Sequence, residues 1–181
     1  ASDVYKRQAT DGGGINILDF QTMKFSHLKH ISDDEQSLPN NSIYRLYKDQ
    51  MDNIWIGSIH GGLFAIKKVF IKTYKDVPLN NPNGVSERTV VSIFEDKDTL
   101  LWIGTDGGGI NSFDQKTNTF HHYPTTYGEK VTSITDFSEN ELLLSCFNKG
   151  SLPLIREPHR CNLFPLSMTL FRKENFHPVI W

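Results

Sequence analysis

The chain has 181 residues, of which 38% are hydrophobic and 22% are charged, and its formal net charge is −2 at pH 7. This composition is sufficient to bury a core. The slight negative charge argues against a surface that neutralises nucleic-acid phosphates, and no apolar run approaches the roughly 18 residues of a membrane span. We therefore expect no direct contact of this segment with nucleic acid.

The first residues differ in character from the rest. Residues 3–8 (DVYKRQ) resemble the translation of a transposon adaptor used to prepare sequencing libraries, and the repeat pattern begins at Ala9, midway through a repeat. We interpret residues 1–8 as an adaptor artefact and leave them out of fold reasoning. The alternative is an ordinary exposed basic tail.

A glycine-rich motif occurs three times. The copies are residues 10–16 (TDGGGIN), 58–64 (SIHGGLF) and 105–111 (TDGGGIN), which lie 48 and 47 residues apart. The similarity extends further, because residues 42–49 (SIYRLYKD) align without a gap on residues 89–96 (TVVSIFED). The chain is therefore predicted to be a repeat protein.

Short β-type segments fill each repeat. In the second repeat they are residues 43–47, 54–58, 63–66 and 70–74, rich in Ile, Val, Phe, Tyr and Trp and bounded by turn formers. A period in the forties with four short strands is typical of a propeller blade. We predict an all-β fold, a partial β-propeller of about three to four four-stranded antiparallel blades.

The repeats divide the chain as follows. We assign residues 9–28 to a half blade, 29–74 and 75–123 to two blades, 124–155 to a degenerate blade, and 156–181 to a partial outer strand near Leu163 with a following loop. In the degenerate blade, Leu143 replaces the tryptophan of the repeat and Phe147-Asn148 replace its Asp-Gly pair.

Most of the repeated residues have a predicted structural role. Trp55 and Trp102 lie mid-strand, where a large ring can fill the wedge between neighbouring blades. A glycine-rich loop can also hold phosphate, but that chemistry needs a helix and usually a Lys after the glycines. A strand follows here instead, so we predict hairpin turns.

The turn residues are the candidate ligand-binding residues. Asp11 and Asp106 occupy equivalent turns two blades apart, where they either cap the turn or line the rim of a ligand surface. His60 is interpreted as the replacement of Asp106 at the corresponding turn of the second repeat, and it is either an exposed turn residue or a ligand contact. These assignments rest on turn position alone.

No metal, cofactor or catalytic group is predicted. His121 and His122 are adjacent on a strand and point to opposite faces, which does not suit chelation. Cys146 and Cys161 either form a disulfide, in an oxidising compartment, or Cys146 is a lone buried thiol. Aromatic residues such as Tyr44, Tyr127 and Phe147 could stack on sugars, although aromatic residues also fill propeller cores.

The third repeat carries a family resemblance. Residues 101–105 (LWIGT) with Gly108-Gly109-Ile110-Asn111 and Phe113-Asp114, preceded by residues 93–96 (IFED), closely resemble the two-component regulator propeller repeat. The resemblance covers residues 9–155 and is weakest in the last repeat. It departs from the family pattern at residues 58–60 and at Leu143.

The resemblance implies a signalling role. It identifies the chain as a truncated part of the periplasmic sensor region of a hybrid two-component histidine kinase, a class found especially in gut Bacteroidetes. Such a receptor is expected to be a homodimer, to reach the membrane only through downstream segments, and to switch on polysaccharide-utilisation genes in response to oligosaccharides. The sensor segment itself is expected not to be an enzyme.

Two other function classes stay open from the residues. A propeller enzyme, such as a polysaccharide lyase or a glycosidase, would need two carboxylates to converge, for example Asp11, Asp106 or Glu87, and the sequence does not show this. A protein-interaction propeller scaffold would need no such site. Product release would indicate the enzyme, and affinity for a protein partner alone would indicate the scaffold.

Overall fold

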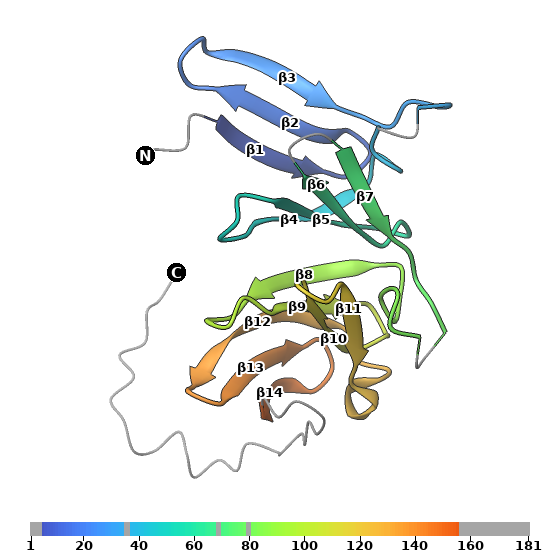
Figure 1. Ribbon diagram of the computed structural model, residues 1–181, viewed down its shortest axis with the longest axis vertical. Helices are drawn as coiled ribbons and strands as arrows, with labels where there is room; N and C mark the ends of the chain where they lie inside the picture. Colours follow the sequence, from blue (N-terminus) through green and yellow to red (C-terminus); the bar gives the residue numbers. More distant parts are fainter. Residues whose placement is uncertain (1–4, 35–36, 68–69, 79–80, 156–181) are drawn as a thin grey trace.

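The computed structural model describes residues 5–34, 37–67, 70–78 and 81–155. Within these ranges the chain is all-β, with four antiparallel sheets and one short 3-10 turn, η1 (Pro124–Thr126). The sheets follow one another in chain order along the long axis of the molecule (Figure 1). In these ranges no helix is long and apolar enough to cross a membrane.

Each sheet is one propeller blade, formed by strands that are consecutive in the chain. Blade 1 contains β1 (Tyr5–Thr10), β2 (Gly14–Asp19) and β3 (Lys24–Leu28). Blade 2 contains β4 (Ile43–Lys48), β5 (Ile54–Ser58), β6 (Leu63–Lys67) and β7 (Phe70–Tyr74). Blade 3 contains β8 (Val90–Glu95), β9 (Leu101–Thr105), β10 (Ile110–Asp114) and β11 (Thr119–His122). Blade 4 contains β12 (Val131–Ser138), β13 (Glu141–Cys146) and β14 (Gly150–Ile155).

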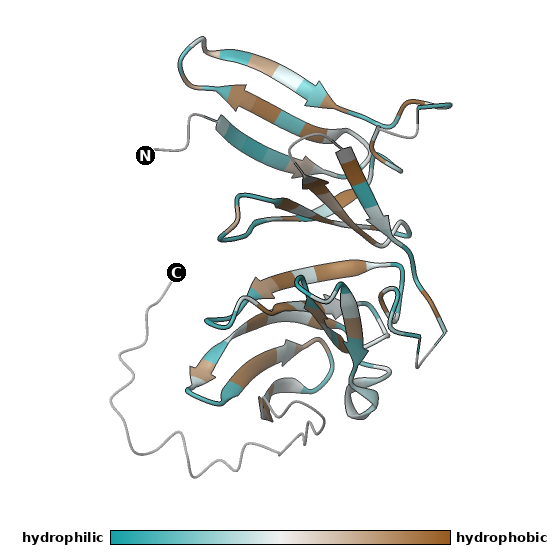
Figure 2. Ribbon diagram, in the orientation of Figure 1, coloured by the Kyte–Doolittle hydropathy of each residue, from teal (hydrophilic) through white to brown (hydrophobic). Residues whose placement is uncertain are grey.

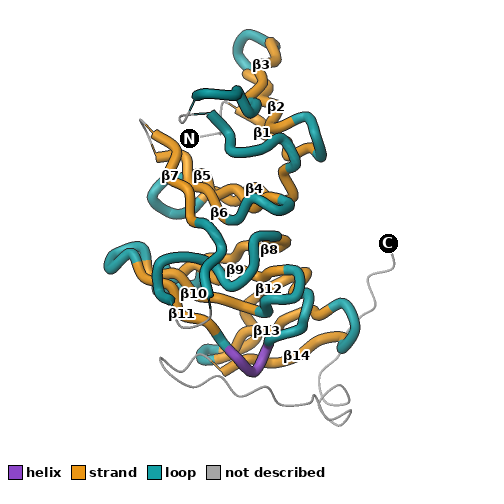
Figure 3. Tube along the Cα trace, turned by 90° about the vertical axis from the view of Figure 1, so that its right-hand side faces the viewer, coloured by secondary structure: helices purple, strands orange, loops and turns teal. Residues whose placement is uncertain are grey.

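The predicted all-β propeller is confirmed, and the four strands predicted for the second repeat agree with β4 to β7 to within one residue. The expected outer strand near Leu163 lies outside the described residues. Strands make up most of the described chain, as the tube in Figure 3 shows.

The core consists of three apolar clusters, each between two neighbouring blades. On β5, Ile54 and Ile56 pack toward Ile15 of blade 1, whereas Trp55 between them packs toward Leu101 of blade 3. The period-two alternation of a strand thus gives each blade two apolar faces. Trp102 repeats the arrangement between blades 3 and 4. The predicted position of both tryptophans between neighbouring blades is confirmed. Figure 2 shows that β8, between blades 2 and 3, is largely hydrophobic.

The first strands of blades 2, 3 and 4 neighbour one another, as inner propeller strands do. Each of these three strands has a register shift near its first residues. The shifts lie between Ile43 and Arg45 in β4, Val90 and Ser92 in β8, and Val131 and Ser133 in β12. One extra residue therefore bends each inner strand at the same place.

Blade 1 differs from the sequence-based expectation. Residues 1–8 are predicted to be an adaptor artefact, yet β1 begins at Tyr5 and pairs with β2 along its whole length. The pair Ala9–Ile15 corresponds to Gly104–Ile110 of blade 3, so β1 matches the second strand of a blade. Residues 6–8 (KRQ) therefore occupy the positions of residues 101–103 (LWI), and polar side chains stand where the other blades bury apolar ones.

Candidate functional site

The glycine turns and the segments between blades meet at one end of the propeller, which we call the loop face. In each of the three glycine turns, the N–H of the last glycine donates a backbone hydrogen bond to the segment that leads into the next blade. The bonds run from Gly14 N to Asn41 O (2.8 Å), from Gly62 N to Arg88 O (2.6 Å) and from Gly109 N to Glu129 O (3.3 Å). Because the same bond recurs from blade to blade, the loop face presents repeated positions side by side.

The glycine motifs are hairpin turns, as predicted. Gly12, Gly14, Gly107 and Gly109 have positive φ angles between 73° and 101°, which favour glycine over other residues. A hydroxyl group closes each turn by donating a hydrogen bond to the carbonyl of the last glycine. The pairs are Thr10 with Gly14 (2.8 Å), Ser58 with Gly62 (3.2 Å) and Thr105 with Gly109 (2.8 Å).

Asp11 and Asp106 are exposed, and they do not cap these turns. The carboxylate of Asp106 accepts a hydrogen bond from Lys130 Nζ at 2.8 Å, and this bond raises the pKa of Lys130. Among the described residues, Asp11 makes no side-chain hydrogen bond. Among the described residues, no backbone N–H donates a hydrogen bond to either carboxylate, so the alternative in which these residues cap the turn is wrong for both.

The structure also corrects the register of His60. Ile59 N donates to Ser42 O at 3.0 Å, just as Asp106 N donates to Thr89 O at 3.0 Å. Ile59 is thus the counterpart of Asp106, and His60 is the counterpart of Gly107. His60 has a φ of +59°, which is uncommon for a residue with a side chain. Its exposed imidazole is therefore presented by the most strained position of the turn.

A hollow of about 620 Å³ opens beside His60 on the loop face of blade 2. Its lining mixes polar side chains with apolar surface and comes from the segment before β4, the β5–β6 turn and the end of β7. The lining residues are Pro39, Asn40, Ser42, Ile59, His60, Gly61, Thr73, Lys75 and Asp76. Of the three candidate ligand residues, only His60 lines this hollow. No hydrogen bond or ion pair between described residues joins Asp11, His60 and Asp106 to one another.

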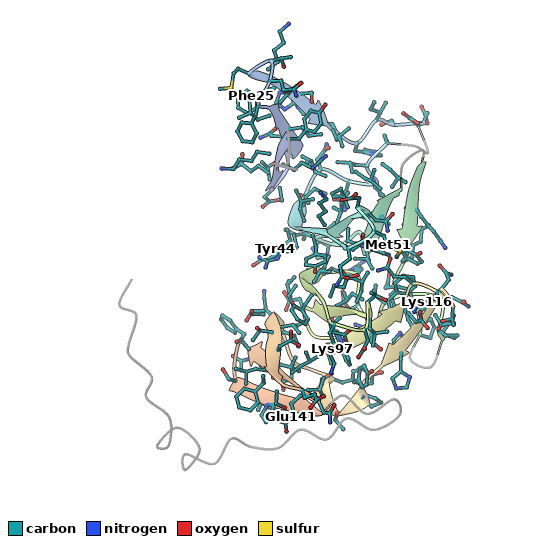
Figure 4. The ribbon with its side chains drawn as sticks, turned by 60° about the vertical axis from the view of Figure 1, so that its left-hand side comes forward. Phe25, Tyr44, Met51, Lys97, Lys116 and Glu141 are labelled. Atoms are coloured by element: carbon teal, nitrogen blue, oxygen red, sulfur yellow. The ribbon has the colours of Figure 1, made fainter. Side chains whose placement is uncertain are left out.

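Two of the three aromatic residues considered for sugar stacking are exposed. Tyr44 is the extra residue at the β4 register shift and projects from the inner strand (Figure 4). Phe147 is 74% exposed, and its N–H donates to Lys130 O at 3.0 Å, which makes it the blade 4 counterpart of Asp106. Tyr127 is half-buried, and burial raises the pKa of its hydroxyl.

An Asp–Trp pair in blades 2 and 3 was missed by the sequence reasoning. Trp55 Nε1 donates to Asp49 Oδ2, and Trp102 Nε1 donates to Asp96 Oδ2, each at 2.8 Å. The other oxygen of each carboxylate accepts backbone N–H groups of its own turn, from Met51 and Asn53 in blade 2 and from Asp98 and Leu100 in blade 3. The available signal was the six-residue spacing from Asp to Trp in both repeats.

His121, His122 and Cys146 occupy ordinary strand positions. His121 is exposed and His122 is buried, so the two point to opposite faces as predicted. Cys146 is a free, buried thiol, and burial raises its pKa to about 11. Cys161 lies outside the described residues. Among the described residues, no group of three or more His, Cys, Asp or Glu side chains is placed to hold a metal ion.

A comparison with known protein families finds a match in two of the repeats. The family model of the two component regulator propeller matches residues 37–60 and 84–107, which contain the first two strands of blades 2 and 3. No curated protein matches the sequence significantly.

Solved structures share the fold at low sequence identity. The extracellular domain of a hybrid two component system from B. thetaiotaomicron superposes with a TM-score of 0.66 at 17% identity, over 92% of this chain and 23% of that chain. Streptogramin B lyase gives 0.63 at 17% identity, over 92% and 52%. PorZ from Porphyromonas gingivalis gives 0.62 at 12% identity, over 88% and 25%.

The chain thus spans about a quarter of the hybrid two component system domain and about half of the lyase. At these identities the superpositions establish the fold, and the family model identifies two-component regulator propeller repeats in blades 2 and 3. The chain is therefore a β-propeller segment in which residues 37–60 and 84–107 match the two-component regulator propeller repeat.

Proposed function

We propose that this propeller is the ligand-sensing part of a hybrid two-component sensor outside the cytoplasm, in the periplasm, and that it binds an oligosaccharide on its loop face. One observation carries the proposal. Blades that match the two-component regulator propeller repeat present, on the loop face, a hollow with polar side chains beside His60, and the rings of Tyr44 and Phe147 are exposed.

This surface suits a sugar for two physical reasons. A sugar ring has an apolar C–H face that packs on an aromatic ring, and Tyr44 and Phe147 are exposed rings of that kind. Its hydroxyl groups need donors and acceptors, which the Asn, Ser, Thr, Lys and Asp side chains of the hollow supply. The hollow also lies within the usual size of small-molecule sites, about 300–1,000 Å³.

In the complete receptor, the bound oligosaccharide favours one arrangement of a homodimer. A ligand shifts such an equilibrium only by its difference in affinity for the two arrangements, so it must contact groups that move with the dimer. The shift then reaches the kinase across the membrane and changes the transcription of polysaccharide-utilisation genes.

Calorimetric titration with a panel of oligosaccharides tests the proposal. We expect one glycan class to bind without turnover, and His60→Ala and Tyr44→Ala to weaken it at least tenfold. Met51→Ala is the control, because Met51 is exposed in the β4–β5 turn, away from the glycine turns (Figure 4). Release of shortened glycans would instead show a propeller lyase or glycosidase. Binding of a protein partner with no glycan bound would show a scaffold.

A further inference from the structure

The loop face has the same backbone frame in blades 2, 3 and 4. In each blade, the residue after the second strand donates its N–H to the carbonyl of the residue before the first strand. The bonds run from Ile59 to Ser42, from Asp106 to Thr89 and from Phe147 to Lys130, each at 3.0 Å. The backbone is therefore equivalent in the three blades, whereas the side chains at these positions differ.

One of these positions carries an ion pair between neighbouring blades. Lys130 Nζ donates to Asp106 Oδ2 at 2.8 Å, and both side chains are partly exposed. The counterparts of Asp106 are Ile59 in blade 2 and Phe147 in blade 4, and neither side chain can form such a pair. A partly exposed ion pair also adds little to the stability of a fold. The blade fold therefore does not require the Asp106–Lys130 pair.

The Asp106–Lys130 pair keeps unused hydrogen-bonding capacity. Among the described residues, Asp106 Oδ1 accepts no hydrogen bond, and Asp106 takes only one of the three N–H donors of the Lys130 ammonium. An acceptor beside a donor suits two neighbouring hydroxyl groups of one sugar residue. Because the charges of Asp106 and Lys130 compensate each other, the pair offers no net attraction to an anion.

Tyr44 of blade 2 belongs to the same surface. It is the extra residue at the β4 register shift and is 51% exposed, whereas its counterpart in blade 3, Val91, is 3% exposed. Tyr44 helps to raise the pKa of Lys130, after the larger effect of the hydrogen bond with Asp106, so Tyr44 and Lys130 lie close enough to interact electrostatically. In Figure 4 the ring of Tyr44 projects away from the sheets.

We propose that Tyr44, Asp106 and Lys130 form a subsite that selects an uncharged sugar residue over an acidic one. This inference rests on the proposed binding of an oligosaccharide to the loop face. The C–H face of the sugar packs on Tyr44, one hydroxyl donates to Asp106 Oδ1, and a neighbouring hydroxyl accepts from Lys130. The carboxylate of a uronic acid at this place would meet the like charge of Asp106, and Lys130 would not compensate it because Lys130 is already paired.

Arg45 provides a contrast on the same strand. It follows Tyr44 on β4, is exposed, and has no carboxylate partner among the described residues. An acidic glycan would depend on an uncompensated cation of this kind, because hydrogen bonds between ionised groups are the strong ones. The subsite for an uncharged sugar does not use Arg45. Arg45→Gln therefore distinguishes the two classes of ligand.

Calorimetric titration of the whole chain with two sets of tetrasaccharides tests the proposal. The neutral set is prepared from glucan, mannan, xylan, galactan and arabinan, and the acidic set from polygalacturonate, alginate and chondroitin sulfate. We expect at least one neutral tetrasaccharide and no acidic one to bind. Asp106→Ala and Lys130→Met should each weaken the binding at least tenfold, whereas Arg45→Gln should change it less than twofold.

Thermal unfolding separates an effect on binding from an effect on folding. Because the Asp106–Lys130 pair is partly exposed, Asp106→Ala and Lys130→Met should each shift Tm by less than about 4 °C. Lys48→Met is the matched control, because it breaks another exposed ion pair, between Lys48 and Asp52 at 3.0 Å, at the other end of β4. It should leave glycan binding unchanged.

Two results would overturn this inference while the proposed oligosaccharide binding stands. The first is tighter binding of an acidic tetrasaccharide, with a tenfold loss in Arg45→Gln. The second is binding of a neutral tetrasaccharide that is lost in His60→Ala but unchanged in Asp106→Ala and Lys130→Met, which would place the sugar in the hollow alone. If no tetrasaccharide of either set binds, this inference and the proposed function both fail.

Discussion

Trp102 offers the sharpest test of how the blades are held together. Its indole is 2% exposed, stacks on Tyr123 with a ring separation of 5.4 Å, and belongs to the cluster between blades 3 and 4. A ring of this size buries about 200 Å², so Trp102→Ala should lower the free energy of unfolding by about 4–5 kcal/mol. That is a large part of the stability of a typical domain, about 5–15 kcal/mol.

The hydrogen bond from Trp102 to Asp96 can be measured separately. Trp102→Phe keeps an aromatic ring but leaves the buried Asp96 Oδ2 without its indole donor, so we expect a loss of about 1–3 kcal/mol. Phe147→Ala is the control, since that ring is exposed and should change the free energy by less than about 0.5 kcal/mol.

Urea unfolding gives these free energies, and hydrogen exchange shows where the damage lies. Because each blade contacts only its neighbours, Trp102→Ala should accelerate exchange in β12 to β14 more than in β4 to β7. The reasoning fails if Trp102→Ala costs no more than Phe147→Ala, or if exchange rises evenly over all four blades.

Three further predictions concern single sites. Gly109→Ala should destabilise the protein more than Gly107→Ala, although both glycines have a positive φ. An added Cβ at Gly109 meets Thr126, whereas an added Cβ at Gly107 meets open space. Equal urea midpoints for the two variants would contradict this. Burial raises the pKa of Glu95. The contribution of Glu95 to the free energy of unfolding is therefore full below the ordinary glutamate pKa and is lost as pH rises through the folded-state pKa. Glu95→Gln should make the free energy of unfolding less dependent on pH above about pH 4, and an unchanged pH dependence would contradict this. In a Cys161→Ser variant, the Cys146 thiol, with a pKa raised to about 11 by burial, should react with Ellman's reagent at pH 8 only after unfolding. Prompt reaction of this variant in its native state would refute the burial of Cys146.

The fold could be predicted because repetition multiplies a weak signal. A single five-residue apolar run does not distinguish a strand from a piece of helix, but the same run in register at three places, each bounded by turn formers, does. The degenerate blade shows the same effect. Gly150, the one glycine kept there, has a φ of +72°, and Gly109 at the equivalent position has +73°.

The candidate site was less predictable, because side-chain partners come from neighbouring blades. The sequence placed Asp106 on a turn, but its partner Lys130 lies in the segment before the next blade. The sequence pattern aligns His60 with Asp106, whereas the backbone hydrogen bond from Ile59 N to Ser42 O makes Ile59 the counterpart of Asp106. The hollow beside His60 is also lined by Thr73 on the outer strand β7 and by Lys75 directly after that strand.

The sequence by itself determined the repeat length, the strand order within each blade and the two-faced strands, because these follow from local alternation and turn chemistry. Only the tertiary structure decided which apolar face meets which blade, which carboxylates hold the indoles of Trp55 and Trp102, and why Phe25 is exposed while Phe120 is buried. These features depend on contacts between blades, and residues that are identical in the repeat pattern differ in environment according to the blade beside them.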